Sequence, residues 1–256
     1  MDLSLDNTIT AKVVKAVAEF NLINDGDRIA VGISGGKDST FLLIVLKIFE
    51  KHFKINFDLE AVHVNPGFEN YLDQEIIDLC NKLEIDLKII DTEIAKYIEN
   101  EKNDNPCSKC AHFRKGAIIN YLKQNNFNKL AFGHHLDDAV ETFLMSVFYS
   151  GQLKTLQPKR FLSENKIDII RPLIYLRENT IKDEIAKKGI KPKKSPCPYD
   201  GNSGRSEVRK NFNKYFNNEQ LFANLISAMR DNNNIELWPE KMNYDKLAKK
   251  MKNYWR

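Results

Sequence analysis

The six residues Ser34-Gly35-Gly36-Lys37-Asp38-Ser39 combine the groups that a protein uses to hold an anion. They follow Arg28–Ile33, a short β-branched run typical of a buried strand, and precede Thr40–Leu46, which has the apolar spacing of a helix. The two glycines permit backbone angles closed to other residues, so successive N–H groups can point into one concavity at the helix N-terminus. The stretch predicts a phosphate-binding loop, against the alternative of an ordinary glycine turn.

The side chains of this loop add to its affinity for an anion. Ser34 and Ser39 each offer a hydroxyl donor, and Lys37 adds a full positive charge. Asp38 would repel a phosphate directly, so we expect its carboxylate to cap the helix or to hold Mg²⁺. The spacing excludes the Walker A pattern, in which four residues separate the first glycine from a Gly-Lys pair.

A second polar segment, Phe132–Thr142, follows a predicted strand at 129–133. Asp138, Glu141 and Thr142 stand at positions i, i+3 and i+4, so one face of a helix carries all three. Carboxylates at a helix start suit the macrodipole and could also hold Mg²⁺ across phosphate oxygens. The segment therefore predicts a second part of the same anion site.

Other side chains of this segment have competing interpretations. Asp137 either takes part in the site or simply caps the helix. His134 and His135 are adjacent, and neighbouring side chains on a strand diverge, so the pair is not expected to share one metal ion. We assign both histidines to the edge of the pocket.

Three of the four cysteines form a candidate metal or redox site. Cys107 and Cys110 make a C-x-x-C pair, and Cys197 stands far downstream between two prolines. Cys80 is in register with the apolar positions around it, so we expect it in the core.

The residues alone leave three interpretations of this set open. A structural zinc site needs a fourth ligand, for which His112 or Asp200 is available. A redox pair needs Cys107 and Cys110 alone. An iron–sulfur cluster can be held by three thiolates, with one iron open to a small ligand.

Strand and helix patterns alternate along the chain. Strands are predicted near 28–34, 59–65, 86–91, 129–133 and 167–171, and helices near 9–21, 38–51, 71–83, 111–125, 136–149 and 178–188. This alternation predicts an α/β fold, a parallel sheet with helices on both faces. Because ligands bind beyond the carboxyl ends of such strands, the segments at 34–39 and 134–138 are expected to meet there.

The pattern changes after Ser195. We expect an N-terminal helix in residues 1–24, a nucleotide-binding domain in 25–200 and a helical C-terminal extension in 201–256. The polar stretch 99–106 is expected to be a loop. Net charge is +4 overall, but residues 186–194 carry five lysines and no acid, which suits a polyanion such as RNA or a solvated surface.

Composition places the chain among globular proteins. Apolar residues make up 42% and charged residues 29% of the 256 residues, and no apolar run approaches the roughly 20 residues of a membrane span. The N-terminal residues lack the basic and apolar regions of a signal peptide. We expect a cytoplasmic protein without a membrane partner, whose cysteines are reduced, metal-bound or catalytic.

The loop at Ser34–Ser39 resembles the PP-loop, S-G-G-x-D-S, of the ATP pyrophosphatase superfamily at all six positions. The segment after Phe132 resembles the G-H-x-x-D-D-x-x-E-T block of tRNA-modifying members. The resemblance covers residues 25–210 and implies that ATP is cut between its α and β phosphates to activate a carbonyl oxygen. The implied ATP and Mg²⁺ site comprises Ser34, Gly35, Gly36, Lys37, Asp38, Ser39, His63, Gly133, His134, Asp137, Asp138 and Thr142.

The cysteine spacing resembles a narrower group. C-x-x-C-x-x-x-R-x-G, from Cys107 to Gly116, is similar to the tRNA-cytidine-32 2-sulfurtransferases, as is Phe148–Gly151. In that group three cysteines hold a 4Fe-4S cluster, which implies the set Cys107, Cys110 and Cys197. The chain lacks the zinc-finger cysteine pairs that the two-thiouridine enzymes of thermophiles carry at both ends. It also has Pro198-Tyr199-Asp200 where many relatives have a further cysteine.

The resemblance implies a sulfurtransferase that adenylates the C2 oxygen of a tRNA pyrimidine and replaces it by sulfur. The implied catalytic residues are Lys37, Asp38, Arg114 and Asp138. The implied partners are tRNA, a sulfur donor such as a cysteine desulfurase or free sulfide, and a second copy of the chain. The alternatives are a lysidine synthetase, which needs no three-cysteine site, and a zinc-stabilised nucleotide-binding protein without catalysis.

Overall fold

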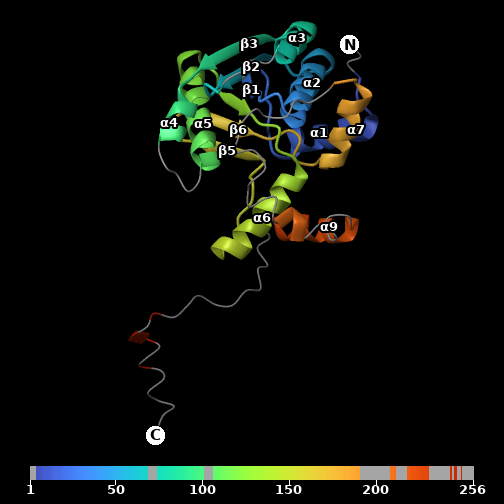
Figure 1. Cartoon of the computed structure of the whole chain (residues 1–256). Coiled ribbons are helices and arrows are strands. Elements are labelled where there is room, and N and C mark those ends of the chain that lie inside the picture. Colours follow the sequence, from blue (N-terminus) through green and yellow to red (C-terminus); the bar gives the residue numbers. More distant parts are fainter. Residues whose placement is uncertain are drawn as a thin grey trace.

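One six-stranded sheet organises the computed structural model, in the order β3-β2-β1-β4-β6-β5 (Figure 1). The structure describes residues 4–68, 74–100, 106–190, 208–211 and 218–230, with residues 243, 245, 246 and 249. The strands are β1 (Asp27–Gly32), β2 (Phe57–Asn65), β3 (Asp86–Asp91), β4 (Lys129–Ala131), β5 (Lys159–Leu162) and β6 (Ile167–Ile170). All neighbours pair in parallel except β5, which runs antiparallel to β6 at the edge.

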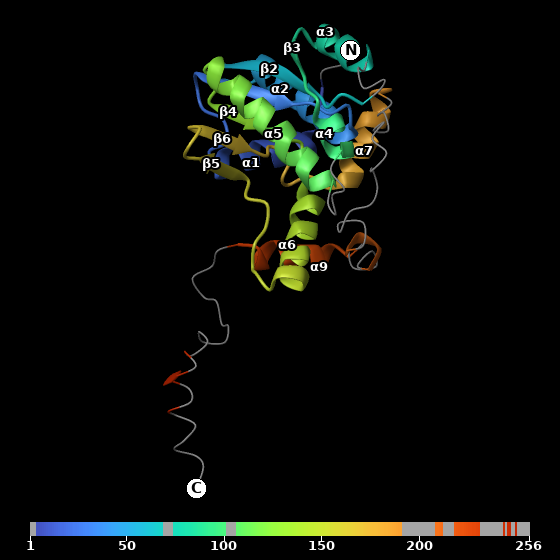
Figure 2. The same cartoon turned by 60° about the vertical axis from the view of Figure 1, so that its left-hand side comes forward.

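Helices cover both faces of the sheet, as Figures 1 and 2 show. They are α1 (Asn7–Glu19), α2 (Lys37–His52), α3 (Gln74–Leu83), α4 (Ile94–Asn100), α5 (Pro106–Gln124), α6 (Leu136–Ser150), α7 (Glu178–Lys187) and α9 (Glu219–Ala228). The predicted α/β class with a mostly parallel sheet is confirmed. Within the described residues, no helix has the length and apolar character needed to cross a membrane.

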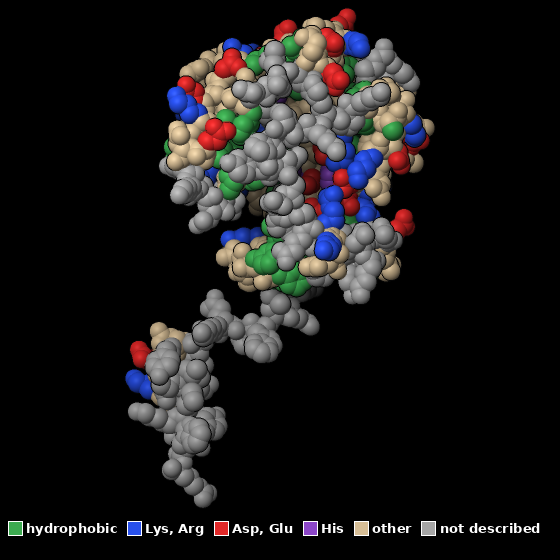
Figure 3. Space-filling view, in the orientation of Figure 1, with side chains coloured by type: hydrophobic (Ala, Val, Ile, Leu, Met, Phe, Trp, Pro, Cys, Tyr) green, Lys and Arg blue, Asp and Glu red, His purple; other side chains and the backbone are tan. Residues whose placement is uncertain are grey.

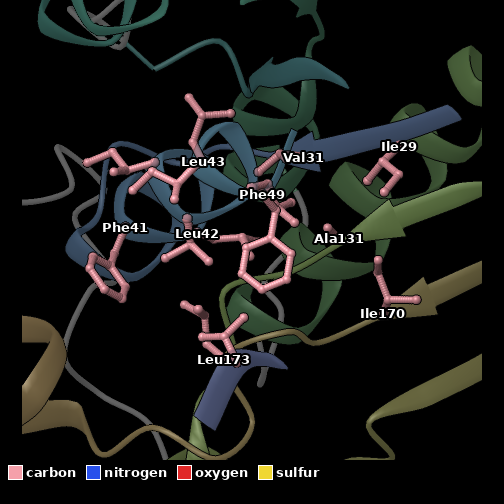
Figure 4. Close-up of a cluster of buried hydrophobic side chains, with 14 of the residues drawn as sticks. Ile29, Val31, Phe41, Leu42, Leu43, Phe49, Ala131, Ile170 and Leu173 are labelled. Atoms are coloured by element: carbon pink, nitrogen blue, oxygen red, sulfur yellow. The ribbon is translucent and has the colours of Figure 1, made fainter. Parts of the chain in front are cut away.

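Two apolar layers follow from the alternation of side chains along each strand. One layer packs α1, α2, α3 and α7 on the sheet, and α2 is its centre, with Phe41 through Leu46 fully buried (Figure 4). The other layer packs α4 and α5 against the opposite face, on Ala30, Val62 and Leu130. Both layers hold the strand ends rigidly, which fixes the loops that follow them.

The helix α6 begins at the carboxyl edge of the sheet and extends away from the body, with α9 beside it (Figures 1 and 2). A small apolar cluster joins them, in which Leu136 and Val140 of α6 contact Val208 and Phe222. The helix α9 lies in the predicted C-terminal extension. The bounds proposed for the three segments 1–24, 25–200 and 201–256 stay predictions.

Three elements differ from the sequence expectation. The stretch expected to be a loop from residue 99 is helical up to Asn100, because Ile94, Ala95 and Ile98 bury one face of the short helix α4. The edge strand β5 was not predicted, since its four residues Lys159–Leu162 are two basic residues followed by two apolar ones and lack the alternation typical of a strand. The helix α5 also starts five residues earlier than expected, so Cys107 and Cys110 lie in its first turns.

Candidate functional site

The loop between β1 and α2 is folded around the hydroxyl of Ser39. This hydroxyl accepts a hydrogen bond from the Ser34 amide at 3.1 Å and donates one to the Gly36 carbonyl at 3.0 Å. Gly35 has φ +79°, a conformation that favours glycine. The loop is therefore closed on itself, with α2 beginning directly behind it.

Gly133 brings the second predicted segment against this loop. A Cβ atom on Gly133 would lie 2.6 Å from the carbonyl oxygen of Asp38 and 2.9 Å from the amide nitrogen of Ser39. Real Cβ atoms do not approach backbone so closely, so only glycine allows the end of β4 to pass the start of α2. The expectation that the segments at 34–39 and 134–138 meet at one edge is confirmed.

Three side chains from the two segments converge on one point. The imidazole Nε2 of His135 lies 3.7 Å from Asp38 Oδ1 and 3.5 Å from Asp138 Oδ2. His135 is 2% exposed, and its backbone amide donates to Asp138 Oδ2 at 3.0 Å. Asp138 and His135 thus cap α6 reciprocally and place two carboxylates beside a buried imidazole.

Neither Asp38 nor Asp137 has the helix-capping role that the sequence suggested for it. The N-cap of α2 is Gly36, without a side-chain cap, and the Asp38 carboxylate instead accepts from Lys37 Nζ at 2.9 Å. Asp137 does not cap α6. It accepts from Arg177 Nε at 3.1 Å and from the Glu178 amide at 2.8 Å, so it fastens the start of α7 to the site.

An ion-pair chain surrounds Lys37. Its ammonium lies 2.9 Å from Glu178 Oε1, and the other carboxylate oxygen lies 2.8 Å from Arg209. Burial acts to lower the pKa of Lys37, but the carboxylates of Asp38 and Glu178 outweigh it and raise that pKa. Burial likewise acts to raise the pKa of Glu178, yet Lys37 and Arg209 lower it to about 2. Figure 3 shows basic, acidic and histidine side chains gathered near the start of α6.

The helix positions after Asp138 point inward. Glu141 is 1% exposed and forms an ion pair with Arg209 at 2.7 Å. The hydroxyl oxygen of Thr142 is also buried and makes no hydrogen bond within the described residues. Glu141 therefore anchors Arg209 beside the site.

Two further predicted residues stand at the sides of the site. His63 is 3% exposed at the end of β2, and its Nδ1 lies 2.9 Å from the carbonyl oxygen of Ile33 at the base of the loop. His134 accepts from Arg171 Nε at 3.1 Å and faces the Phe132 ring. The two histidines of the pair thus diverge, as predicted, and only His135 faces the carboxylates.

The cysteine pair opens helix α5 at the same edge of the sheet. Cys107 is exposed, while Cys110 is half-buried and packs on the layer that includes Val64 and Phe132, near the ends of β2 and β4. Arg114 follows Cys110 by four residues, one helical turn, so both share a face of α5. Cys197 lies outside the described residues. Cys80 is buried in the core, as predicted.

Residues 5–215 match the sequence model of the PP-loop domain. The chain belongs to the PP-loop family. It is 35% identical over 199 residues to the tRNA-cytidine(32) 2-sulfurtransferase of Pelobacter propionicus, covering 77% of this chain and 74% of that one. It is 34% identical over 197 residues to the protein of that name from Syntrophotalea carbinolica, covering 76% of both. The predicted family and the sulfurtransferase class are confirmed.

A solved structure has the same fold. The U34-tRNA thiolase NcsA from Methanococcus maripaludis, determined with its [4Fe-4S] cluster, superimposes with a TM-score of 0.69. The match covers 88% of this chain and 79% of that one at 24% identity. It establishes the α/β architecture of a PP-loop protein.

The PP-loop residues of this chain fit a nucleotide with its metal ion. Asp38 Oδ1 is buried and has no hydrogen-bond partner among the described residues, as expected of an oxygen that would ligate Mg²⁺. The close contact at Gly133 keeps side-chain atoms out of the space beside the loop. The two thiols at the start of α5 are of the type that binds iron or zinc. No group of three or more His, Cys, Asp or Glu side chains in the described part of the chain is by itself arranged to hold a metal ion.

Sequence reasoning missed three charged residues of the PP-loop site. Arg177 and Glu178 belong to the start of α7, and Arg209 comes from beyond residue 207; none lies in a recognisable motif. The one available signal was the position of Glu178 in the first turn of a predicted helix. That signal is common to many helices, so only the tertiary structure connects these residues with Lys37.

Proposed function

We propose that this PP-loop protein thiolates tRNA, replacing the C2 oxygen of cytidine 32 by sulfur at the expense of ATP. The name shared by the bacterial relatives supports this substrate, and their similarity extends over three quarters of the chain. The matched PP-loop domain supports ATP as the activating reagent. The cytoplasmic location, the sulfur donor and a homodimer stay predictions.

The observation that carries the proposal is the junction of the PP-loop with the start of α6. Gly133 lets the two segments touch, and Asp38 and Asp138 then face one imidazole. Two carboxylates beside a phosphate loop suit a metal-bound triphosphate. The arrangement supports phosphoryl chemistry at the carboxyl edge of the sheet, next to the cysteines of α5.

The proposed reaction has two displacements. The C2 oxygen of the pyrimidine attacks the α phosphorus of ATP, and pyrophosphate leaves with the electrons of the broken bond. Sulfide then adds at C2, and AMP leaves with the oxygen. Lys37 and the Ser39 end of the loop stabilise the charge of the leaving pyrophosphate, and Asp38 would hold the Mg²⁺ that neutralises it.

Cys107, Cys110 and Cys197 would hold the 4Fe-4S cluster, whose open iron would supply a binding position for sulfide. Arg114 is one turn of α5 away from Cys110, so we place it beside the base whose oxygen is replaced. Asp138 is held by the His135 amide, which keeps its carboxylate beside the imidazole that Asp38 also faces. In this proposal the PP-loop activates the base and the cysteine site determines which atom replaces the oxygen.

Mass spectrometry of tRNA nucleosides tests the assignment. A strain without the gene is expected to lose 2-thiocytidine and to regain it when the wild-type gene is returned. Asp38→Asn is expected to restore none, whereas Asp183→Asn, on the exposed face of α7, restores it fully. If 2-thiocytidine persists without the gene, the substrate is wrong; loss of 2-thiouridine or lysidine instead would name another reaction.

Two measurements on anaerobically purified protein test the chemistry. The ATP products are expected to be AMP and pyrophosphate in the presence of tRNA and sulfide, and release of ADP would exclude adenylation. The protein is expected to contain about four irons per chain and to absorb broadly at about 400 nm, as a 4Fe-4S cluster does. Colourless protein that holds zinc would contradict the iron–sulfur assignment and favour the structural zinc alternative.

A further inference from the structure

Three basic side chains from three elements converge on the face of the sheet that α5 covers. They are Lys115 of α5, Arg160 of β5 and Arg171, which directly follows β6. We call them the β5–α5 cluster. None of the three belongs to the PP-loop, to the segment after β4 or to the cysteine pair.

The strand register places the two arginines on this face. Leu162 of β5 packs in the α5 layer, so Arg160, two residues earlier on the same strand, points to the same side. Ile167 of β6 belongs to the same layer, and Arg171 stands four residues after it, again on that side. The Arg171 amide donates to the Pro158 carbonyl at 2.9 Å, which continues the β5–β6 pairing and sets the two arginines near each other.

Lys115 lies within electrostatic range of the guanidinium groups of Arg160 and Arg171. Burial lowers the pKa of its ammonium, and Arg160 and Arg171 lower it further. Neither Lys115 nor Arg160 forms an ion pair with a carboxylate in the part of the chain that the structure describes. The charges of Lys115 and Arg160 therefore create a field that attracts an anion.

The position of the cluster relates it to the reacting groups. Arg171 donates to His134, which directly precedes the imidazole facing Asp38 and Asp138. Lys115 stands five residues after Cys110 on α5. The cluster is thus linked through His134 to the segment after β4, and through α5 to the helix that carries the cysteine pair.

We propose that the β5–α5 cluster binds a backbone phosphate of the tRNA beside the nucleotide that enters the site. The inference rests on the proposed function and names how its substrate is positioned. Lys115 is half-buried and Arg160 exposed, so their side chains contact the phosphate, while Arg171, 8% exposed, contributes charge from below. The ATP phosphates have their own donors in the PP-loop and Lys37, which favours RNA as the source of this anion.

The test compares two variants on one helix. Lys115→Gln removes a cation of the cluster, and Lys123→Gln removes an exposed lysine near the other end of α5 as a matched control. The affinity of the purified full chain for an unmodified tRNA transcript with cytidine at position 32 is measured at several salt concentrations, and ATP affinity is measured in parallel.

We expect the substitutions to lower the affinity for tRNA but not the affinity for ATP. Lys115→Gln and Arg160→Gln together weaken tRNA binding about tenfold and reduce the slope of log affinity against log salt by about one per phosphate contact. Their ATP affinity stays unchanged. Their thermal midpoint does not fall, because removing two of three like charges relieves repulsion.

Three results would overturn the inference. If the cluster variants bind tRNA as tightly as Lys123→Gln does, the proposed phosphate site is wrong. The thiolation proposal still stands in that case, provided that wild-type protein binds tRNA and forms 2-thiocytidine. A loss of ATP affinity alone would assign the cluster to the nucleotide. Wild-type protein without affinity for tRNA would overturn the proposed function together with this site.

Discussion

The ammonium of Lys37 and the carboxylate of Glu178 lie 2.9 Å apart, although 140 residues separate them along the chain. The pair joins the PP-loop to the first turn of α7. Arg209 occupies the second oxygen of the same carboxylate at 2.8 Å. Glu178 thus lies between two cations at an anion site, so its ionisation depends on both Lys37 and Arg209.

The first prediction concerns acid stability. The pKa of Glu178 is lowered to about 2, so its charge contributes stability that is fully present above pH 4.5 and is lost as pH falls through 2. A lowering of the pKa from 4.5 to about 2 corresponds to on the order of 3 kcal/mol at neutral pH. Urea unfolding of Glu178→Gln is expected to show a loss of this order at pH 7 that shrinks toward pH 2.

Glu93→Gln provides the control, since the Glu93 side chain is 84% exposed and its nearest cation lies 3.9 Å away. It is expected to follow the wild-type pH profile. Equal slopes for Glu178→Gln and wild-type protein between pH 2 and 5 would show that the pair with Lys37 does not stabilise the fold.

The second prediction concerns Gly133. A methyl group there would lie 2.6 Å from the Asp38 carbonyl, so Gly133→Ala must push the PP-loop away from α6. ATP affinity is expected to fall at least tenfold, with a lower thermal midpoint. Equilibrium dialysis with labelled ATP and differential scanning calorimetry measure the two effects.

Gly116→Ala is the matched substitution. Gly116 lies inside α5, and an added Cβ would meet nothing within 4 Å. Alanine is favoured over glycine in a helix by about 1 kcal/mol, so this variant is expected to be slightly more stable with unchanged ATP affinity. If Gly133→Ala binds ATP as Gly116→Ala does, the contact at the start of α2 does not constrain the loop.

The sequence predicts the site best where one loop carries it. The glycine turn at 34–39 and the acidic pair Asp137-Asp138 follow strands, and parallel topology brings such ends together at one edge. The contact between Gly133 and Asp38 could not be derived, because a glycine in a strand end has many reasons to be there. The role of Asp138 as a cap also depends on His135, which turns inward only once α6 is formed.

Contacts between residues of distant elements cannot be predicted from motifs and their spacing. Glu178 meets both Lys37 and Arg209 through the tertiary packing, and no spacing along the chain encodes that geometry. The edge strand β5 could not be predicted from the sequence for a similar reason. Its four residues gain a strand conformation from pairing with β6 rather than from their own pattern.

The third prediction separates the cysteines by reactivity. Burial raises the pKa of Cys80 to about 11, so almost no thiolate forms at neutral pH. In metal-free protein, iodoacetamide is expected to modify the exposed Cys107 well before Cys80. Peptide mass spectrometry over a time course measures the order, and early labelling of Cys80 in folded protein would contradict its burial.

The fourth prediction concerns the ion pair between Glu141 and Arg209. Glu141 is 1% exposed, and both Nε and one terminal nitrogen of Arg209 lie 2.7 Å from its Oε1. Burial acts to lower the pKa of Arg209, but Glu141 and Glu178 raise it, so the guanidinium stays charged. Arg209→Met leaves a buried carboxylate without this cation and is expected to cost about 3 kcal/mol in urea unfolding.

A double-mutant cycle decides whether that cost belongs to the pair. Glu141→Gln removes the buried charge, so Arg209→Met is expected to cost at least 1 kcal/mol less in that background than in wild-type protein. The same coupling is expected in ATP affinity, because Arg209 also holds the carboxylate of Glu178 that pairs with Lys37. Costs that add within about 0.5 kcal/mol would mean that the two residues act independently, and Arg209 would then stabilise the site through Glu178 alone.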